Sequence, residues 1–329
     1  MPARESIPIA VIGGGPAGYT AALYAARSGH RPVCIEGFES GGQITRSYLV
    51  ENYPGVQSGT SGADLSARIR EQAVEFGATV LLDEVLSVDL SQRPFAITTT
   101  SGEYAADAVI VATGSKPRSL GLPGEEELVG RGLAYCALCD GAFFAGQDVV
   151  VVGGGNAAVG ESLAMARVAS RVTLVHRRTD FRADQVVVDT ARQTDGIEFK
   201  TPYVVEELRA NDAGDLVAVR LRNLADGTVH HQRTAGLFVA IGHEPAVELV
   251  APYLRIEDGH IVTSPTSTAT SVEGVFAAGD VADSRYRQAI TAAASGCQAA
   301  IDAERWLVTG EWTGLPTDSP GRPLRAVYA

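Results

Sequence analysis

The feature that most constrains the fold of this chain is a glycine-rich turn that occurs twice. An apolar run at 7–12 precedes G-G-G-P-A-G at 13–18, and a second apolar run at 148–152 precedes G-G-G-N-A-A at 153–158. Helical spacing follows both turns. In a strand-turn-helix unit such glycines allow a tight turn and bring the backbone close to a pyrophosphate, which the helix N-terminus attracts. The sequence therefore predicts an α/β fold with two Rossmann-like dinucleotide-binding domains.

The residues that end the next strand differ between the two copies. The first copy reaches an acid, Glu36, 18 residues after the last glycine of its turn. In the second copy His176, Arg177 and Arg178 follow the strand. An acid here accepts a hydrogen bond from a ribose 2′-hydroxyl, whereas arginine suits a 2′-phosphate. We expect the first unit to bind a nucleotide without that phosphate and the second to bind NADP(H); the alternative for the arginines is a solvated charged run.

The order of these segments predicts that one domain is inserted into the other. A chain of 329 residues is long enough for about two domains. The strands before residue 114 are few for a doubly wound sheet, so a downstream strand that ends in Gly279 and Asp280 is expected to complete it. The expected layout is a first domain at 1–116 and 245–310, an inserted domain at 117–244, crossing segments at 115–119 and 242–247, and a loosely held Gly/Pro-rich tail at 311–329.

A close pair of cysteines, Cys136 and Cys139, precedes the second glycine turn and is followed by Asp140. Zinc normally takes four ligands, and the other cysteines, Cys34 and Cys297, are single. A structural disulfide that closes so short a loop would stabilise the fold by only roughly 2 kcal/mol, and a reducing compartment would tend to open it. The spacing therefore favours a redox pair, with Asp140 as a proton carrier or as a simple turn residue.

Composition excludes some classes of partner. The net charge of -12 and the isoelectric point near 5.0 disfavour binding to nucleic acid or anionic membranes. No apolar run approaches the ~18 residues of a membrane span, residues 1–8 lack a signal-peptide core, and four cysteines are too few for a disulfide-rich secreted class. We therefore expect a cytoplasmic protein that binds neither nucleic acid nor membranes.

The two nucleotide-binding units and the cysteine pair together predict a path for electrons. Nicotinamide gives hydride, and a flavin can accept it and then reduce a disulfide. One nucleotide site of each kind plus a dithiol would complete this path. Asp280, at the end of its strand, is expected to contact the ribityl or ribose part of the flavin nucleotide.

Around these motifs the chain resembles the low-molecular-weight thioredoxin reductases, from about residue 8 to residue 307. Besides the two glycine turns, the resemblance rests on G-G-Q at 41–43, E-N-Y-P-G at 51–55, A-T-G at 112–114, C-A-L-C-D at 136–140, H-R-R-T-D-F-R-A at 176–183 and G-D-V-A-D-S-R-Y-R-Q-A at 279–289. It implies a homodimer whose FAD domain is interrupted by an NADPH domain that carries the cysteines and moves relative to the flavin. Leu138 departs from the family pattern, which usually has Thr there.

The resemblance also implies roles for individual residues. It implies that Cys139 faces the flavin and that Asp140 protonates during exchange. FAD contacts are implied for Gly13, Gly15, Pro16, Ala17, Gly18, Glu36, Gly42, Gln43, Asn52, Thr113, Gly114, Gly279, Asp280, Arg287, Gln288 and Ala289. NADPH contacts are implied for Gly153, Gly155, Asn156, Ala158, His176, Arg177, Arg178 and Arg182.

The function expected from these features is that of a thioredoxin-disulfide reductase, which passes electrons from NADPH through FAD and the dithiol to a small thioredoxin-like protein. One alternative is a flavin-dependent oxidase of a small-molecule dithiol that uses oxygen and ignores NADPH, although the H-R-R segment would then have no purpose. A non-catalytic redox-sensing or nucleotide-binding module is the other.

Overall fold

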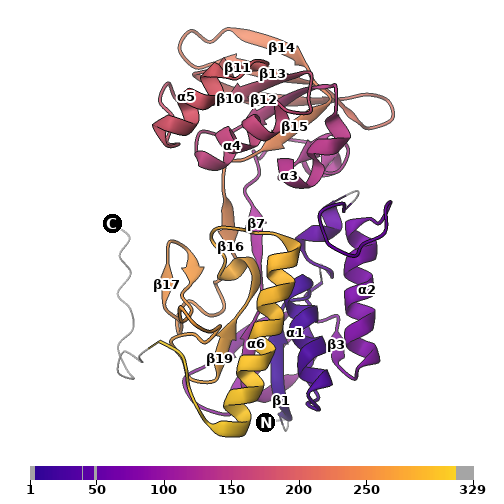
Figure 1. The fold of residues 1–329 in the computed structure, drawn as a ribbon, viewed down its shortest axis with the longest axis vertical. Coiled ribbons are helices and arrows are strands. Elements are labelled where there is room, and N and C mark those ends of the chain that lie inside the picture. Colours follow the sequence, from indigo (N-terminus) through magenta and orange to yellow (C-terminus); the bar gives the residue numbers. More distant parts are fainter. Residues whose placement is uncertain (1–3, 39, 48–49, 316–329) are drawn as a thin grey trace. The chain divides into compact units, whose positions relative to one another are not determined.

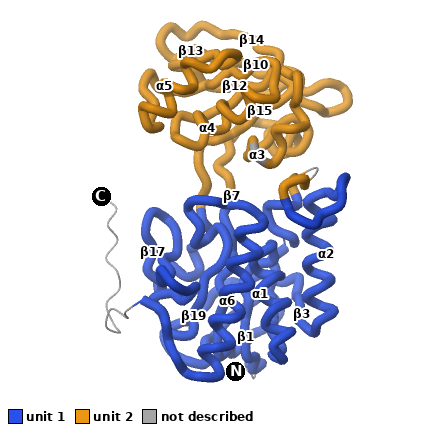
Figure 2. Tube along the Cα trace, in the orientation of Figure 1, with its two compact units in different colours: residues 1–45, 53–116, 245–329 blue, residues 46–52, 117–244 orange. Residues whose placement is uncertain are grey.

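The computed structural model describes residues 4–38, 40–47 and 50–315, and these fall into two compact units. Unit 1 contains the described residues up to 45, those at 53–116 and those from 245 onward; unit 2 contains the described residues at 46–52 and 117–244 (Figure 2). The chain thus leaves unit 1, builds unit 2 and returns. The short segment at 46–52 groups with unit 2, although the residues on either side of it belong to unit 1.

Unit 1 is built on a seven-stranded sheet in the order β3-β2-β1-β6-β5-β4, with β19 also paired to β6. Its strands are β1 (Glu5–Ile12), β2 (Val33–Ile35), β3 (Thr79–Leu81), β4 (Val85–Asp89), β5 (Phe95–Thr99), β6 (Glu103–Val111) and β19 (Val275–Ala277). Strands β3, β2, β1, β6 and β19 are parallel, and β5 and β4 continue from β6 as an antiparallel pair. Val275 pairs with Val109, so the downstream segment adds a strand to this sheet.

Three helices pack in unit 1: α1 (Pro16–Arg27), α2 (Gly62–Glu75) and α6 (Ala289–Thr309), with α1 between the other two (Figure 1). Proline at the start of α1 suits a first turn whose N–H groups have no partner within the helix. A capping box of Ser61 and Asp64 starts α2, and Gly310, at a φ of 71°, ends α6.

Unit 2 has a five-stranded parallel sheet in the order β11-β10-β9-β15-β8, beside a three-stranded antiparallel sheet in the order β12-β13-β14. The parallel strands are β8 (Leu133–Ala134), β9 (Asp148–Val152), β10 (Arg171–Val175), β11 (Ile197–Lys200) and β15 (Gly236–Val239). The antiparallel strands are β12 (Tyr203–Ala210), β13 (Leu216–Asn223) and β14 (Val229–Arg233), and the helices are α3 (Ala137–Asp140), α4 (Asn156–Met165) and α5 (Gln185–Gln193). A mostly parallel sheet in unit 1 and a parallel sheet in unit 2 confirm the predicted α/β fold class.

Short elements complete the fold. They are the 3-10 helices η1 (Gln43–Arg46), η2 (Glu126–Leu128), η3 (Gly141–Phe144) and η4 (Gly279–Val281), and the small strands β17 (Ile256–Glu257) and β18 (His260–Ile261).

Two strands, β7 (Ser115–Pro117) and β16 (His243–Pro245), pair with each other where the chain passes between the units. The N–H of Arg118 donates to the carbonyl of Gly242 at 2.9 Å, and the N–H of Ala246 donates to the carbonyl of Gly114 at 3.0 Å. Both expected crossing segments therefore lie in one short ladder.

The start of the C-terminal tail is packed rather than loose. The ring of Trp312 lies 5.5 Å from that of Phe276 and 6.3 Å from that of Trp306, and the N–H of Leu315 donates to the carbonyl of Thr270 at 3.1 Å. The expectation of a loosely held tail was therefore wrong for residues 311–315, because it overlooked this aromatic anchor; residues 316–329 lie outside the described residues.

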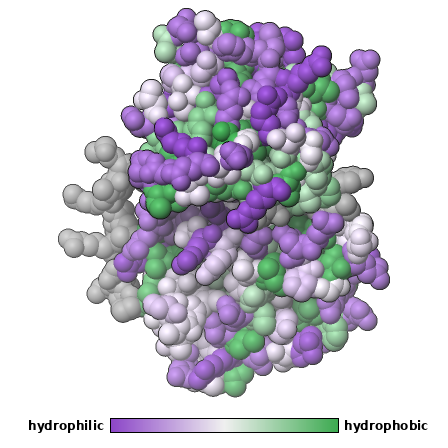
Figure 3. All heavy atoms as spheres, turned by 45° about the horizontal axis from the view of Figure 1, so that its top comes forward, coloured by the Kyte–Doolittle hydropathy of each residue, from purple (hydrophilic) through white to green (hydrophobic). Residues whose placement is uncertain are grey.

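Hydrophilic and hydrophobic residues are intermixed on the face drawn in Figure 3, as is usual for surfaces that face water. Among the described residues, none of the helices has the length and apolar character needed to cross a membrane.

Candidate functional site

The first glycine turn of unit 1 is too crowded for side chains but open in front of the helix. A Cβ atom on Gly13 would lie 2.2 Å from the carbonyl oxygen of Ala112, and one on Gly18 would lie 1.8 Å from that of Gly13. Gly15 caps α1 without a side-chain hydrogen bond, and the nearest atom to a Cβ there would be the Cα of Gly42, at 3.7 Å. The unpaired N–H groups at this helix start fit a pyrophosphate.

Hydrogen bonds hold the G-G-Q loop at 41–43 beside this turn. The hydroxyl of Ser66 in α2 donates to the carbonyl of Gly41 at 2.8 Å, and the N–H of Gly41 donates to the hydroxyl of Tyr19 at 3.1 Å. Gln43 then starts η1. The structure thus brings Gly42 and Gln43 to the same turn as Gly15.

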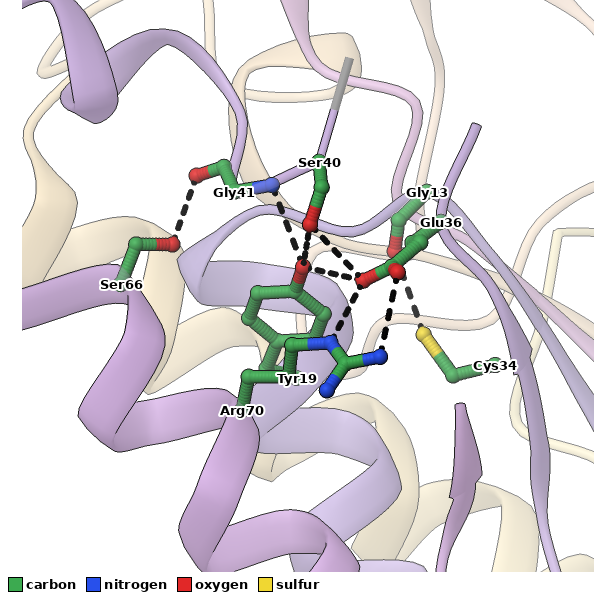
Figure 4. Close-up of polar contacts among 8 residues, drawn as sticks. All are labelled: Gly13, Tyr19, Cys34, Glu36, Ser40, Gly41, Ser66 and Arg70. Carbon is green, nitrogen blue, oxygen red and sulfur yellow. Dashed lines mark hydrogen bonds and ion pairs between the residues drawn. The ribbon is translucent and has the colours of Figure 1, made fainter. Parts of the chain in front are cut away.

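Glu36 follows β2 and is buried among donors from three segments (Figure 4). Its Oε2 accepts hydrogen bonds from Tyr19 Oη at 2.5 Å, Ser40 Oγ at 3.1 Å and Arg70 Nε at 3.0 Å, while Oε1 accepts one from Arg70 NH2 at 3.3 Å. Burial alone would raise the pKa of Glu36, but the bonds from Arg70 and Tyr19 outweigh it and hold that pKa below its ordinary value. The carboxylate is therefore ionised at neutral pH.

A half-buried acid of unit 1 lies just after β19. Asp280 lies in η4, where its Oδ2 accepts a hydrogen bond from Ser115 Oγ at 3.3 Å. Burial raises the pKa of Asp280 to about 6. The neighbouring Gly279 packs against Ala17 of α1 and donates its N–H to Ser295 Oγ at 2.8 Å. Asp280 thus stands at the carboxyl ends of the parallel strands, where ligands of such sheets bind.

The loop before α6 is held by a single carboxylate. Asp283 accepts hydrogen bonds from the N–H groups of Arg285 at 2.9 Å, Tyr286 at 2.8 Å and Arg287 at 3.1 Å. Arg287 has a φ of 49°, in the left-handed region. Gln288 caps α6, which begins at Ala289.

The structure also positions three other residues that are expected to contact FAD, namely Thr113, Gly114 and Asn52. Thr113 donates its hydroxyl to the carbonyl of Ala246 at 2.7 Å, so it ties the two connecting segments together. Gly114 has a φ of 70° and open space where a Cβ would lie. Asn52 groups with unit 2.

The second glycine turn, in unit 2, packs against a histidine. A Cβ atom on Gly154 would lie 2.2 Å from the ring of His176, whereas one on Gly155, which caps α4 without a side-chain bond, would meet nothing within 4 Å. Gly153 crowds Ala158, and Asn156 exchanges hydrogen bonds with Asp184, at 2.8 and 3.1 Å. The helix start is again open to an anion.

His176 is buried and belongs to the packing of this turn. Its Nε2 lies 3.2 Å from the carbonyl oxygen of Asp180, and its ring centroid lies 5.0 Å from that of Phe181. Burial lowers the pKa of His176, and the charges of the three neighbouring arginines also act to lower it. Arg177, Arg178 and Arg182 are exposed, and the N–H of Arg182 donates to the carbonyl of Gly154 at 2.7 Å. Exposed positive charge beside an open helix start fits a phosphorylated ribose.

The cysteine pair is joined as a disulfide in unit 2, with 5.3 Å between its Cα atoms. The N–H of Cys139 lies 3.2 Å from Cys136 Sγ at the start of α3. Burial raises the pKa of Asp140, the next residue, to about 6. No cluster that could hold a metal ion occurs among the residues that the structure describes, and Cys34 and Cys297 are unpaired thiols there.

Sequence reasoning missed the residues that hold these groups. Tyr19, Ser40 and Arg70 surround Glu36, and Asp283 shapes the loop of Arg287. Glu125 accepts hydrogen bonds from two backbone N–H groups and from the hydroxyl of Tyr135, the residue before Cys136. Asp283 lies within the segment 279–289 on which the resemblance rests, but the motif gives no sign of its hydrogen bonds. The other residues lie in no motif with recognisable spacing, so the sequence offered no signal for them.

Comparisons with known proteins agree with this arrangement. Residues 7–296 match the family described as pyridine nucleotide-disulphide oxidoreductase. The chain is 49% identical over 308 residues to the bifunctional thioredoxin reductase/thioredoxin of Mycobacterium leprae (strain TN), which covers 93% of this chain and 67% of that protein. It is 45% identical over 306 residues to the glucosaminate ammonia-lyase of Pseudomonas fluorescens, over 91% of this chain and 95% of that protein. The solved structure of thioredoxin reductase from Giardia duodenalis has a TM-score of 0.86 and 37% identity, over 93% of this chain and 100% of that one.

Proposed function

The chain belongs to the pyridine nucleotide-disulphide oxidoreductase family, and we propose that within it the chain works as a thioredoxin reductase. Electrons pass from NADPH through FAD to Cys136 and Cys139 and from there to the disulfide of a small thioredoxin. The observation that carries this function is the Cys136–Cys139 disulfide in a unit whose own glycine turn is flanked by arginines. The oxidase alternative gives those arginines no purpose.

Unit 1 would hold FAD. The open start of α1 fits the pyrophosphate, ionised Glu36 fits a ribose hydroxyl, and Asp280 fits the flavin end of the nucleotide. When FAD is bound, its flavin ring supplies the chemistry of accepting two electrons from nicotinamide and passing them to a disulfide. The FAD domain proposed here comprises 1–116 and 245–310.

Unit 2 would hold NADPH, with the proposed domain at 117–244. The start of α4 fits the pyrophosphate of this nucleotide, and the exposed guanidinium groups of Arg177, Arg178 and Arg182 fit its 2′-phosphate. His176 would support the glycine turn by packing against it, because its side chain is buried. Its ring would be neutral near pH 7, because its pKa is lowered, so it would not offer a positive charge to the nucleotide.

The cysteines would carry out disulfide exchange. Two electrons and two protons convert their disulfide into a dithiol, and one thiolate then attacks the disulfide of the partner protein. A mixed disulfide forms, and the partner thiolate that leaves takes up a proton. The second cysteine thiolate attacks the mixed disulfide, so that the Cys136–Cys139 bond forms again and the partner departs as a dithiol. Asp140, with its pKa raised to about 6, can hold or release a proton beside Cys139 near neutral pH.

The remaining expectations belong to the same proposal. The protein works as a cytoplasmic homodimer, its partner is a thioredoxin-like disulfide protein, and the inserted domain moves so that nicotinamide and the cysteines reach the flavin in turn. The paired strands β7 and β16 would take up that motion.

The test is oxidation of NADPH in the presence of a thioredoxin from the same source. The purified protein should be yellow with bound FAD, and NADPH should bleach the flavin anaerobically. A variant with Cys136→Ser and Cys139→Ser should keep flavin bleaching and lose thioredoxin reduction. A flavin that stays oxidised under NADPH would favour the oxidase, and release of ammonia from glucosaminate without NADPH would favour the reaction named for the Pseudomonas fluorescens relative.

A further inference from the structure

The surroundings of Glu36 assign a function to Arg70, a residue of α2 that no glycine motif includes. The side chain of Glu36 is only 2% exposed, whereas that of Arg70 is 36% exposed and reaches in from the surface of the unit. A buried carboxylate without a compensating charge would take up a proton or turn away. Arg70 supplies that charge, and its Nε and NH2 atoms each face a different carboxylate oxygen, at 3.0 and 3.3 Å (Figure 4).

The two oxygens of Glu36 are not equally occupied. Oε2 accepts from Tyr19, Ser40 and Arg70, while Oε1 accepts from Arg70 alone among the described residues. Each carboxylate oxygen can accept at least two hydrogen bonds, so Oε1 has room for one more donor. Glu36 itself lies against the glycine turn, because a Cβ atom on Gly14 would lie 2.2 Å from the Cβ of Glu36.

We propose that Arg70 is a positioning residue for the nucleotide of unit 1. Arg70 keeps Glu36 ionised and oriented, so that Oε1 of Glu36 accepts a hydrogen bond from a hydroxyl of the adenosine ribose. This inference rests on the proposed binding of FAD to unit 1. Arg70 acts through Glu36 and makes no contact with the nucleotide itself. Its fork geometry matters as well as its charge, since two parallel hydrogen bonds fix the plane of the carboxylate.

The experiment measures nucleotide affinity rather than turnover. The full-length protein is stripped of FAD, and FAD is titrated back while quenching of flavin fluorescence reports binding. The variants are Arg70→Gln, Arg70→Lys and, as a matched control, Arg68→Gln, which removes an exposed arginine from the same helix. R70Q is expected to weaken FAD binding by on the order of tenfold, R70K by less, and R68Q not at all.

A second measurement separates positioning from loss of structure. ADP and 2′,3′-dideoxy-ADP compete with FAD for unit 1, and the wild type should prefer ADP because only ADP offers ribose hydroxyls to Oε1. R70Q should lose this preference, with its affinity for dideoxy-ADP close to that of the wild type. If R70Q does not fold, the same loss of preference in R70K supports the proposal.

Three results would overturn it. R70Q could bind FAD as tightly as R68Q does, or R70Q could weaken ADP and dideoxy-ADP by the same factor, which is the signature of general loosening. If R70Q does not fold and R70K still prefers ADP to dideoxy-ADP as strongly as the wild type does, the proposal is also contradicted. A wild-type protein that takes up no FAD at all is a distinguishable result, because it refutes the proposed function before Arg70 is tested.

Discussion

Gly296 of α6 lies against the carbonyl oxygen of Ala17 in the first turn of α1, so close that a Cβ atom at residue 296 would stand 2.1 Å from that oxygen. The two residues are far apart in the sequence, and their contact joins the downstream segment to the helix whose start faces the proposed pyrophosphate site. A single methyl group here should therefore affect both stability and cofactor binding.

Gly296→Ala is expected to lower the free energy of unfolding by about 1 to 3 kcal/mol, because the added atom overpacks two backbones that cannot move apart cheaply. FAD affinity should fall as well, since α1 would shift. Urea unfolding and FAD titration measure the two effects. Gly160→Ala in α4 is the control: a Cβ there meets nothing within 4 Å, and alanine is favoured over glycine in a helix by up to about 1 kcal/mol. A G296A protein as stable as G160A would contradict the contact.

Asp140→Asn is expected to stabilise the oxidised protein at pH 7.5 but not at pH 4. Burial raises the pKa of Asp140 to about 6 from an ordinary 3.8, so the folded protein binds this proton more tightly than the unfolded chain does. The stability associated with this residue is full below pH 4 and is lost as the pH rises through 6, by at most about 3 kcal/mol. Asparagine does not ionise, so the D140N protein should not lose this stability as the pH rises.

Urea midpoints of the wild type and D140N, both saturated with FAD, test this linkage at pH 4 and 7.5. The difference between the two proteins should grow with pH. A difference that is the same at both values would mean that Asp140 does not titrate in this range.

Replacing Arg177 and Arg178 together by glutamine is expected to raise the KM for NADPH by on the order of 10- to 100-fold, since hydrogen bonds to a charged phosphate are lost. The KM for NADH should change little, because NADH has no 2′-phosphate. Steady-state kinetics with both nucleotides measure the ratio. Arg167→Gln, which removes another exposed arginine of unit 2, should leave it unchanged. An equal rise in KM for NADPH and NADH would show that the two arginines do not recognise the 2′-phosphate.

The parts of this molecule that the sequence predicted depend on local chemistry. The two glycine turns fix strand-turn-helix units, and Glu36 and the arginines follow from where the next strand ends. The pairing of β19 with β6 was predictable from the need to complete a sheet. The glycine turns and the residues that follow the next strand are each determined within about 30 residues of chain, the length of a βαβ unit. The contribution of β19 comes from far downstream and was inferred from the number of strands that the sheet needs.

The parts that it did not predict depend on which distant segments meet. Arg70 reaches Glu36 because α2 packs beside α1 with one particular face inward, and an arginine on an amphipathic helix gives no sign of this. Trp312 anchors the start of the tail because Phe276 and Trp306 lie beneath it. The burial of His176 against Gly154 was not predicted either, because it depends on the packing of the whole turn.

Arg287→Gly is expected to separate the stability of unit 1 from its affinity for FAD. Arg287 adopts a φ of 49°, which costs a residue with a side chain on the order of 1 kcal/mol more than it costs glycine. The backbone stays there because Asp283 accepts N–H bonds from Arg285, Tyr286 and Arg287; burial would raise the pKa of Asp283, but these bonds hold it below its ordinary value. Glycine removes this strain, which favours the folded apoprotein by up to about 1 kcal/mol, and it also removes the attraction between Arg287 and Asp280.

The same substitution removes a proposed FAD contact, so the affinity for FAD should fall by on the order of tenfold. Arg287→Lys keeps both the strain and the positive charge, so its stability and FAD affinity should remain near those of the wild type. Urea midpoints of the apoproteins and fluorescence titration with FAD give the two quantities independently. A glycine variant that gains stability without losing FAD would show that the left-handed residue serves only the turn, whereas one that loses stability would mean that the side chain of Arg287 contributes more to the fold than its backbone strain costs.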